Sequence, residues 1–183
     1  MKKQAWLVGA SMLLLAGLAF GQMKDPMVGG HKMFPSKNII ENALNSDDHT
    51  TLVSAVKAAG LVDTLEGSGP FTVFAPTNAA FGKLPSEAVA DLLKPENKAA
   101  LTKVLTYHVV AGRLSASELE KQIKAGHGTA ELTTVAGGKL WAMKQKGHIV
   151  LKDEKGGMAT VTIADVFQSN GVIHVVDTVL MPN

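Results

Sequence analysis

The apolar pattern of this chain changes its period near residue 129, and that change restricts the possible folds more than any other feature. Before residue 129, apolar side chains recur every three or four positions in short segments, which is typical of amphipathic helices. After it, short segments rich in β-branched residues are separated by glycine-containing turns, which is typical of strands. Helices followed by strands along one chain predict a single α+β domain.

The helical half predicts several short helices with recognisable ends. Gly60 can close one of them, and Thr77 or Asn78 can cap the helix that follows an apolar segment at residues 71–75. That segment is apolar on both faces, so we expect a strand that is buried on both sides. The expected helices cover residues 39–44, 52–59, 79–81, 86–93, 95–112 and 115–126.

Turns that contain glycine divide the second half into strands. Asn170-Gly171 is the strongest hairpin signal, because both residue types accept the positive φ of a type I′ turn. We expect antiparallel hairpins, which the strand near residue 73 joins from the helical half. The expected strands cover residues 130–135, 140–144, 148–152, 159–167 and 172–181.

Residues 1–21 are typical of a secretory signal peptide. Two lysines precede an apolar run at residues 5–20, and Ala19 and Gly21 are the small residues that a cut before Gln22 requires. The alternative is an uncleaved membrane anchor. The run is shorter than the roughly 20 apolar residues of a spanning helix and is interrupted by glycine, which favours cleavage.

The sequence after residue 21 predicts one domain preceded by a short tail. Proline and glycine interrupt residues 22–36, so we expect a flexible N-terminal lead there and a single domain at residues 37–183. No second long apolar run follows, so we expect no membrane span after cleavage and a secreted or periplasmic protein.

Charge and cysteine content exclude several classes of function. The signal segment holds two of the 18 basic side chains. The remaining 16 equal the acidic side chains in number, so the chain after residue 21 has no formal net charge. A neutral chain whose one arginine is Arg113 is a poor nucleic-acid binder, because such binding depends on phosphate neutralisation. The absence of cysteine excludes disulfides, thiolate metal sites and a cysteine nucleophile.

Three segments carry a family resemblance: residues 71–85, which begin Phe-Thr-Val-Phe-Ala-Pro-Thr-Asn, residues 105–110 around Tyr-His, and residues 170–182. In order and spacing they resemble the signatures of the fasciclin domain, over residues 37–182. The chain is therefore similar to a secreted single-domain fasciclin-like protein of the bacterial type. The resemblance implies a helical group packed on a wedge-shaped antiparallel β-sandwich, and an extracellular or periplasmic adhesion module that is not an enzyme.

Tyr107 and His108 are the candidate partner-binding residues, since the resemblance links this region to partner contact in animal relatives. His108 also falls on the apolar stripe of its helix, one turn after Val104. A polar group on an apolar face must be hydrogen-bonded, so the favoured alternative is a buried neutral histidine that bonds a polar group such as the Thr77-Asn78 turn. Tyr107 fits a core or an interface equally, because its side chain is amphipathic.

His174 and Asp177 invite a metal or catalytic interpretation that strand geometry disfavours. Side chains three positions apart on a strand point to opposite faces. We therefore expect Asp177 to bond a loop backbone, as a structural polar residue like Thr77, Asn78, Asn170 and Gly171. We expect no catalytic residues, no metal and no cofactor, because the sequence contains no recognisable nucleophile, zinc or phosphate-binding motif.

Two functions remain open from the sequence. The first is a cell-surface or matrix adhesion module that binds a protein or glycan. The alternative is a carrier of an apolar small molecule such as a carotenoid or another lipid, because a helical layer on a wedge of sheets can hold an apolar cleft.

Overall fold

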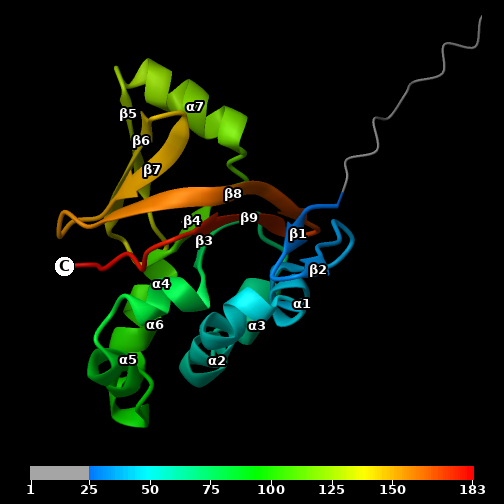
Figure 1. The fold of residues 1–183 in the computed structure, drawn as a ribbon, viewed down its shortest axis with the longest axis vertical. Helices are drawn as coiled ribbons and strands as arrows, with labels where there is room; N and C mark the ends of the chain where they lie inside the picture. Colours follow the sequence, from blue (N-terminus) through cyan, green and yellow to red (C-terminus); the bar gives the residue numbers. More distant parts are fainter. Residues whose placement is uncertain (1–24) are drawn as a thin grey trace, which may run out of the picture.

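Strand β9 (Gly171–Val176), the last strand in chain order, lies inside the sheet and not at an edge (Figure 1). The computed structural model describes residues 25–183, and within them seven strands follow the order β4-β3-β9-β8-β7-β6-β5. Both faces of β9 are buried, as its central position requires. The other strands are β3 (Phe71–Pro76), β4 (Val109–Ala111), β5 (Thr129–Thr133), β6 (Lys139–Gln145), β7 (His148–Lys152) and β8 (Met158–Gln168).

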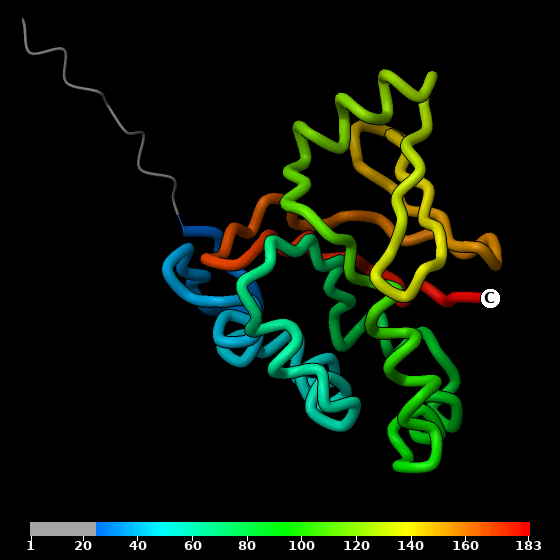
Figure 2. The backbone as a smooth tube through the Cα atoms, turned by 180° about the vertical axis from the view of Figure 1, so that it is seen from behind, coloured from blue at the N-terminus to red at the C-terminus, as the bar shows by residue number. Residues whose placement is uncertain are grey.

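The helices are divided between the two sides of the sheet. In Figure 1 the helices α1 to α6 lie together below the sheet, whereas α7 packs beside β5 and β6 at the other end. Figure 2 shows the same separation from behind. The helices are α1 (Ile39–Leu44), α2 (Thr50–Ala59), α3 (Val62–Glu66), α4 (Asn78–Gly82), α5 (Ser86–Leu92), α6 (Lys98–Tyr107) and α7 (Ala116–Ala125), with 3-10 turns η1 (Asp47–His49) and η2 (Pro95–Asn97).

The α+β class that the sequence predicts is confirmed, and the sheet proves to be mixed. β3 pairs in parallel with β9, while the other strand pairs of the sheet are antiparallel. β3 comes from the helical half, and lying beside β9 buries both of its apolar faces, as expected. Register shifts in β8 bend the sheet, and a bridge between Val110 and Thr134 joins its two edge strands. The sheet therefore closes on itself into a wedge.

Buried apolar side chains form two clusters, one on each side of the central strands. The first fills the space between the helices and the sheet and includes Ile39, Val56 and Ile173. The second lies inside the curled sheet beneath α7 and includes Leu119 and Leu140. The central strands contribute to both clusters, so they couple the helical layer to the wedge.

The flexible N-terminal lead that the sequence predicts at residues 22–36 is wrong for the part that the structure describes, residues 25–36. These residues form a hairpin of β1 (Met27–Val28) and β2 (His31–Lys32), in which Val28 and the following Met33 are buried in the first cluster. The hairpin is attached to the domain core by these two side chains, whereas Met27, His31 and Lys32 are exposed. The predicted signal peptide at residues 1–21 lies outside the described residues.

The helix predicted over residues 95–112 is also shorter than expected. It ends at Tyr107, and the chain then enters β4, a three-residue strand that pairs with β3. The apolar stripe continues through this change of structure because β4 is buried too. No helix within residues 25–183 has the length and apolar character needed to cross a membrane.

Candidate functional site

Tyr107 is fully buried, which leaves its side chain no exposed surface for the predicted partner contact. Its hydroxyl donates to the Lys139 carbonyl at 2.6 Å and accepts from the Glu154 amide at 3.1 Å. Gly138 packs against the ring, and a Cβ at that position would lie 2.7 Å from a ring carbon. Burial raises the pKa of Tyr107. Tyr107 therefore fastens the end of α6 to the strands of the wedge.

His108 is buried beside Tyr107, and both of its ring nitrogens are used. Nδ1 donates to the Val104 carbonyl at 2.8 Å, and Nε2 accepts from the Leu180 amide at 2.9 Å. The proposed partner at the Thr77-Asn78 turn is wrong, because the ring reaches the C-terminal segment instead. Burial lowers the pKa of His108 to about 4. The neutral ring has no nitrogen left for a partner molecule.

Asn170 and Gly171 hold the hairpin for reasons that differ from the predicted type I′ turn. Neither residue has a positive φ, and the two-residue loop is Ser169-Asn170. The Asn170 side chain accepts from the Ile39 amide and donates to the Leu65 carbonyl. Gly171 is needed for close approach, since a Cβ there would lie 2.1 Å from the Phe71 carbonyl oxygen. The parallel partner β3 sets this constraint.

Thr77 and Asn78 have separate structural tasks. Thr77 caps α4 by accepting from the Ala80 amide, as the sequence allows. The Asn78 side chain turns the other way, where it accepts from the Thr51 amide and donates to the Asp47 carbonyl. Asn78 thus joins α4 to the start of α2.

His174 and Asp177 do not form a common site. The buried His174 donates to the Leu114 carbonyl at 2.7 Å and accepts from the Asp165 amide at 3.3 Å. Asp177 accepts from the amide of Thr160 in β8 at 2.8 Å, so its partner is a strand and not a loop. Partial burial raises the pKa of Asp177, but its hydrogen bonds and a nearby lysine lower it overall. Residues 25–183 contain no cluster of three side chains able to hold a metal ion.

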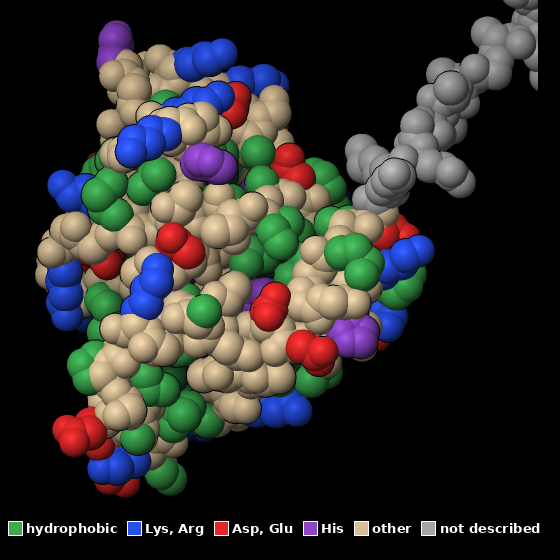
Figure 3. All heavy atoms as spheres, in the orientation of Figure 1, with side chains coloured by type: hydrophobic (Ala, Val, Ile, Leu, Met, Phe, Trp, Pro, Cys, Tyr) green, Lys and Arg blue, Asp and Glu red, His purple; other side chains and the backbone are tan. Residues whose placement is uncertain are grey.

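Basic side chains gather over α7 and the β5–β7 strands on the face seen in Figure 3. Acidic groups lie among them: Lys144 pairs with Glu120 at 2.8 Å, and Lys139 with Glu131 at 2.7 Å. Exposed pairs of this kind contribute little to stability. They reduce the positive charge of this face.

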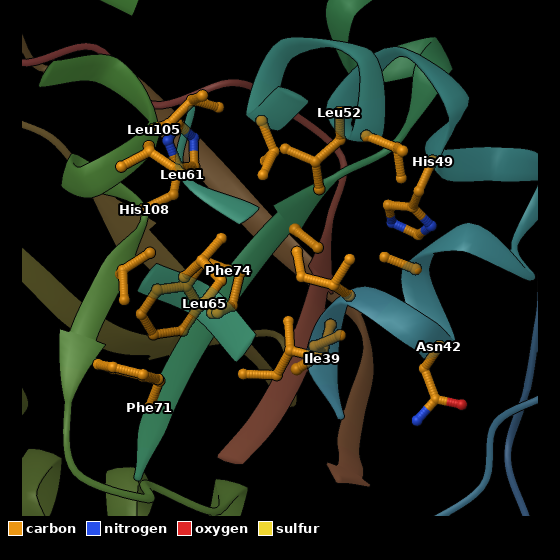
Figure 4. A pocket seen from close by; sticks show the side chains of 18 of the residues that line it. Ile39, Asn42, His49, Leu52, Leu61, Leu65, Phe71, Phe74, Leu105 and His108 are labelled. Atoms are coloured by element: carbon orange, nitrogen blue, oxygen red, sulfur yellow. The ribbon is translucent and has the colours of Figure 1, made fainter. Parts of the chain in front are cut away.

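An apolar cavity lies between the helical layer and the sheet, where α1, α2, α3, β3 and the end of α6 converge (Figure 4). The volume that the centres of water-sized molecules can occupy in the cavity is about 60 Å³. One water needs about 10–15 Å³ by this measure, so the cavity takes several water-sized groups. Its walls are aliphatic and aromatic, with contributions from Ile39, Leu52, Leu65, Phe71 and Leu105.

His49 is a polar member of this wall that the sequence analysis did not single out. It ends η1 and is 3% exposed. Its Nδ1 lies 2.8 Å from the Ser46 hydroxyl, whereas Nε2 has no hydrogen-bond partner among the residues that the structure describes. The Ala75 carbonyl lies beside the ring. Burial lowers the pKa of His49, although the Ala75 carbonyl and Asp48 raise it in part.

The comparison with protein families agrees with this architecture. The Fasciclin domain model matches residues 47–182, and the chain therefore belongs to the fasciclin family, as its sequence signatures predict.

Relatives from bacteria share most of the chain. Protein sll1483 of Synechocystis sp. is 46% identical over 144 residues, which cover 79% of this chain and 73% of that protein. Immunogenic protein MPB70 of Mycobacterium bovis is 37% identical over 145 residues, covering 76% of this chain and 66% of the relative. Cell surface glycolipoprotein MPB83 of the same species is 34% identical over 166 residues, which cover 91% of this chain and 64% of that protein.

A solved structure has the same fold at low sequence identity. The FAS1 domain pair from the insect cell adhesion molecule Fasciclin I matches with a TM-score of 0.72 and 19% identity. The match covers 80% of this chain and 51% of the domain pair, so the chain spans about half of that structure. This likeness concerns the fold alone.

Proposed function

We propose that this protein is a non-enzymatic interaction module that is exported by its N-terminal segment and binds a protein or glycan at a cell surface or in a matrix. The observation that carries the proposal is membership of the fasciclin family over residues 47–182. A relative named as a cell surface glycolipoprotein and a neighbour named as a cell adhesion molecule support it.

The polar groups of the site support a structural rather than a catalytic role. The nitrogens of His108 and His174 are engaged with backbone groups. A general base needs a nitrogen within reach of substrate. Within residues 25–183, the one histidine nitrogen of the cavity wall without a partner belongs to His49. The other ring nitrogen of His49 lies 2.8 Å from the Ser46 hydroxyl, but both side chains are buried, which supports a structural role for this pair as well.

Export and binding can be tested on the natural source. The protein is recovered from the periplasm, the medium and the membranes, and its N-terminus is sequenced; we expect it to begin at Gln22. The purified protein is then immobilised and exposed to cells of the source and to an array of glycans. Retention of saturable binding by the folded protein, with none by the heat-unfolded protein, is the expected result. Protein that keeps Met1 in the membrane contradicts export, and absence of binding contradicts the adhesion role.

A second function, the carriage of an apolar small molecule, is favoured by the cavity of Figure 4. Its volume suits a compact molecule more than a full-length carotenoid, which would need the helices to separate. Organic extraction of protein purified from its source, followed by mass spectrometry and an absorption spectrum, tests this role. A stoichiometric lipid or pigment supports it, and extracts that match a solvent blank contradict it.

A further inference from the structure

An apolar strip lies on the face of β5 to β8 that points away from α7. Leu140 and Ala142 of β6 point into the second cluster, beneath α7. Because side chains alternate along a strand, Trp141 and Met143 point to the opposite face. Val150 of β7 lies directly opposite Met143 and is buried, yet it belongs to neither cluster. Figures 1 and 2 show that α7 covers one side of these strands and that no helix of residues 25–183 covers the other.

Strand pairing places a lysine beside the aromatic ring of this strip. One row across β5, β6, β7 and β8 holds, in register, Glu131, Trp141, Lys152 and Met158. Trp141 is partly exposed, Lys152 is exposed, and Met158 is 44% exposed. Glu131 is already paired with Lys139 at 2.7 Å. Lys152 takes part in no ion pair within residues 25–183, so its charge is available to a partner.

The charge around the strip is positive. Residues 139–158, which contain β6, β7 and the turns that follow them, hold five lysines and two acidic residues. Asp153 is buried and accepts from three backbone amides, and Glu154 accepts from two. Lys146 and Lys155, just outside the two ends of β7, are exposed and also lack an ion pair in the described part of the chain. A negatively charged partner therefore complements this face.

We propose that the face formed by Trp141, Met143, Val150, Lys152 and Met158, the Trp141 face, binds an acidic glycan. A sugar ring stacks on Trp141, and an anionic group of the sugar pairs with Lys152. The inference rests on the adhesion function proposed above and names its partner class and its surface. A sugar ring has an apolar C–H face and a polar edge, which suits an aromatic side chain with a charged neighbour.

The dimensions of the strip favour a glycan over a protein. Neighbouring strands lie about 4.8 Å apart and rise about 3.4 Å per residue, so the area from Trp141 to Met143 and from β6 to β8 measures roughly 7 by 10 Å. A stable protein interface covers about 800 Å² on each partner around an apolar core. The strip is far smaller than such a core and is comparable to the footprint of a sugar unit.

Hexagalacturonic acid and its full methyl ester test the proposal as a matched pair, because they share their sugar rings and differ in charge. Hexaglutamate carries a similar charge on a peptide. Each probe is titrated into the purified protein by calorimetry, and the indole N–H of Trp141 is followed by NMR. Trp141→Thr removes the ring, Trp141→Phe keeps a smaller one, and Lys152→Gln removes the charge. Lys121→Gln changes an exposed lysine of α7, on the opposite side of these strands, and is the matched control.

We expect the acidic sugar to bind saturably and to shift the indole resonance. Trp141→Thr should weaken binding of both sugars about tenfold, and Trp141→Phe by no more than about threefold, because a ring remains for stacking. Lys152→Gln should weaken binding of the acid about threefold and leave that of the ester unchanged. Lys121→Gln should change neither. Lys152→Gln alters an exposed position, so it decides the outcome even if Trp141→Thr does not fold.

Three results would overturn the inference while the adhesion function stands. They are equal binding of the acid and its ester, unchanged binding by folded Trp141→Thr, and binding of hexaglutamate as tight as that of the acidic sugar, which would indicate an acidic protein as partner. Failure of all three probes, while the protein still binds cells or other glycans of the array, likewise overturns this inference alone. Failure to bind cells and the array as well overturns both proposals.

Discussion

Replacing His108 with alanine tests whether this residue is a structural clamp or a contact for a partner. The substitution leaves the Leu180 amide and the Val104 carbonyl without their partner at a site that is 2% exposed. An unsatisfied buried amide costs about 1–3 kcal/mol. The space left by the ring adds about 1–2 kcal/mol. We therefore expect a loss of roughly 3 kcal/mol, which for a domain of this size lowers the Tm by about 6–12 °C.

The assay is thermal and denaturant unfolding of the exported protein at neutral pH, followed by circular dichroism. The exposed His31→Ala variant is the control, and its melting temperature should match that of the unmodified protein. Binding to the partner is measured at a temperature at which the His108→Ala variant is still folded. A loss below about 1 kcal/mol, or normal melting with abolished binding, would refute the structural role.

Three further outcomes follow from the same geometry. Tyr107→Phe keeps the ring but removes a hydroxyl with two backbone partners, so it should cost about 1–3 kcal/mol in denaturant unfolding; an unchanged midpoint contradicts this. Gly171→Ala should destabilise the domain by more than about 3 kcal/mol, because the new Cβ collides with the Phe71 carbonyl; normal melting would mean that β3 and β9 can separate there. Acidification should destabilise the domain between pH 6.5 and about 4, because the unfolded chain protonates His108 at its ordinary pKa and the folded chain does not. His108 should account for a loss of roughly 3 kcal/mol in the free energy of unfolding, measured by melts at different pH values. A His108→Gln variant should lack this contribution to the pH dependence.

Local signals predicted most of the elements correctly. Gly60 adopts the left-handed conformation that closes α2, and Ser115 accepts from the Glu118 amide at the start of α7. The β7 strand has the predicted bounds at residues 148–152. These features depend on residues that are neighbours in the chain, so their chemistry can be read directly from the sequence.

Features that depend on distant segments could not be predicted in this way. The β4 strand has only three residues, which is too short for a recognisable apolar periodicity, and it forms by pairing with β3. Asn170 and Gly171 resemble a turn, but their tasks are set by Ile39, Leu65 and Phe71. The side chain of Tyr107 is compatible with a surface or a core until its two backbone partners are known.

The cavity wall illustrates the same limit for function. His49 lies in a polar stretch between two helical segments, where a histidine is usually solvated. Its burial results from packing of α1 and α2 on β3, and its unpaired nitrogen is visible only in three dimensions. A sequence signal for this site would be a histidine three residues after a serine at a helix entrance, which is too common to be diagnostic.

The central position of β9 decides when this protein can fold during its synthesis. β3 and β8 both use β9 as a neighbour, yet β9 occupies residues 171–176 of 183. A growing chain therefore carries an incomplete sheet until β9 has left the ribosome. Pairings between segments so far apart form slowly, because closing a long loop costs entropy before any contact is gained. The sheet is therefore completed only after β9 has been made, whatever helices form earlier.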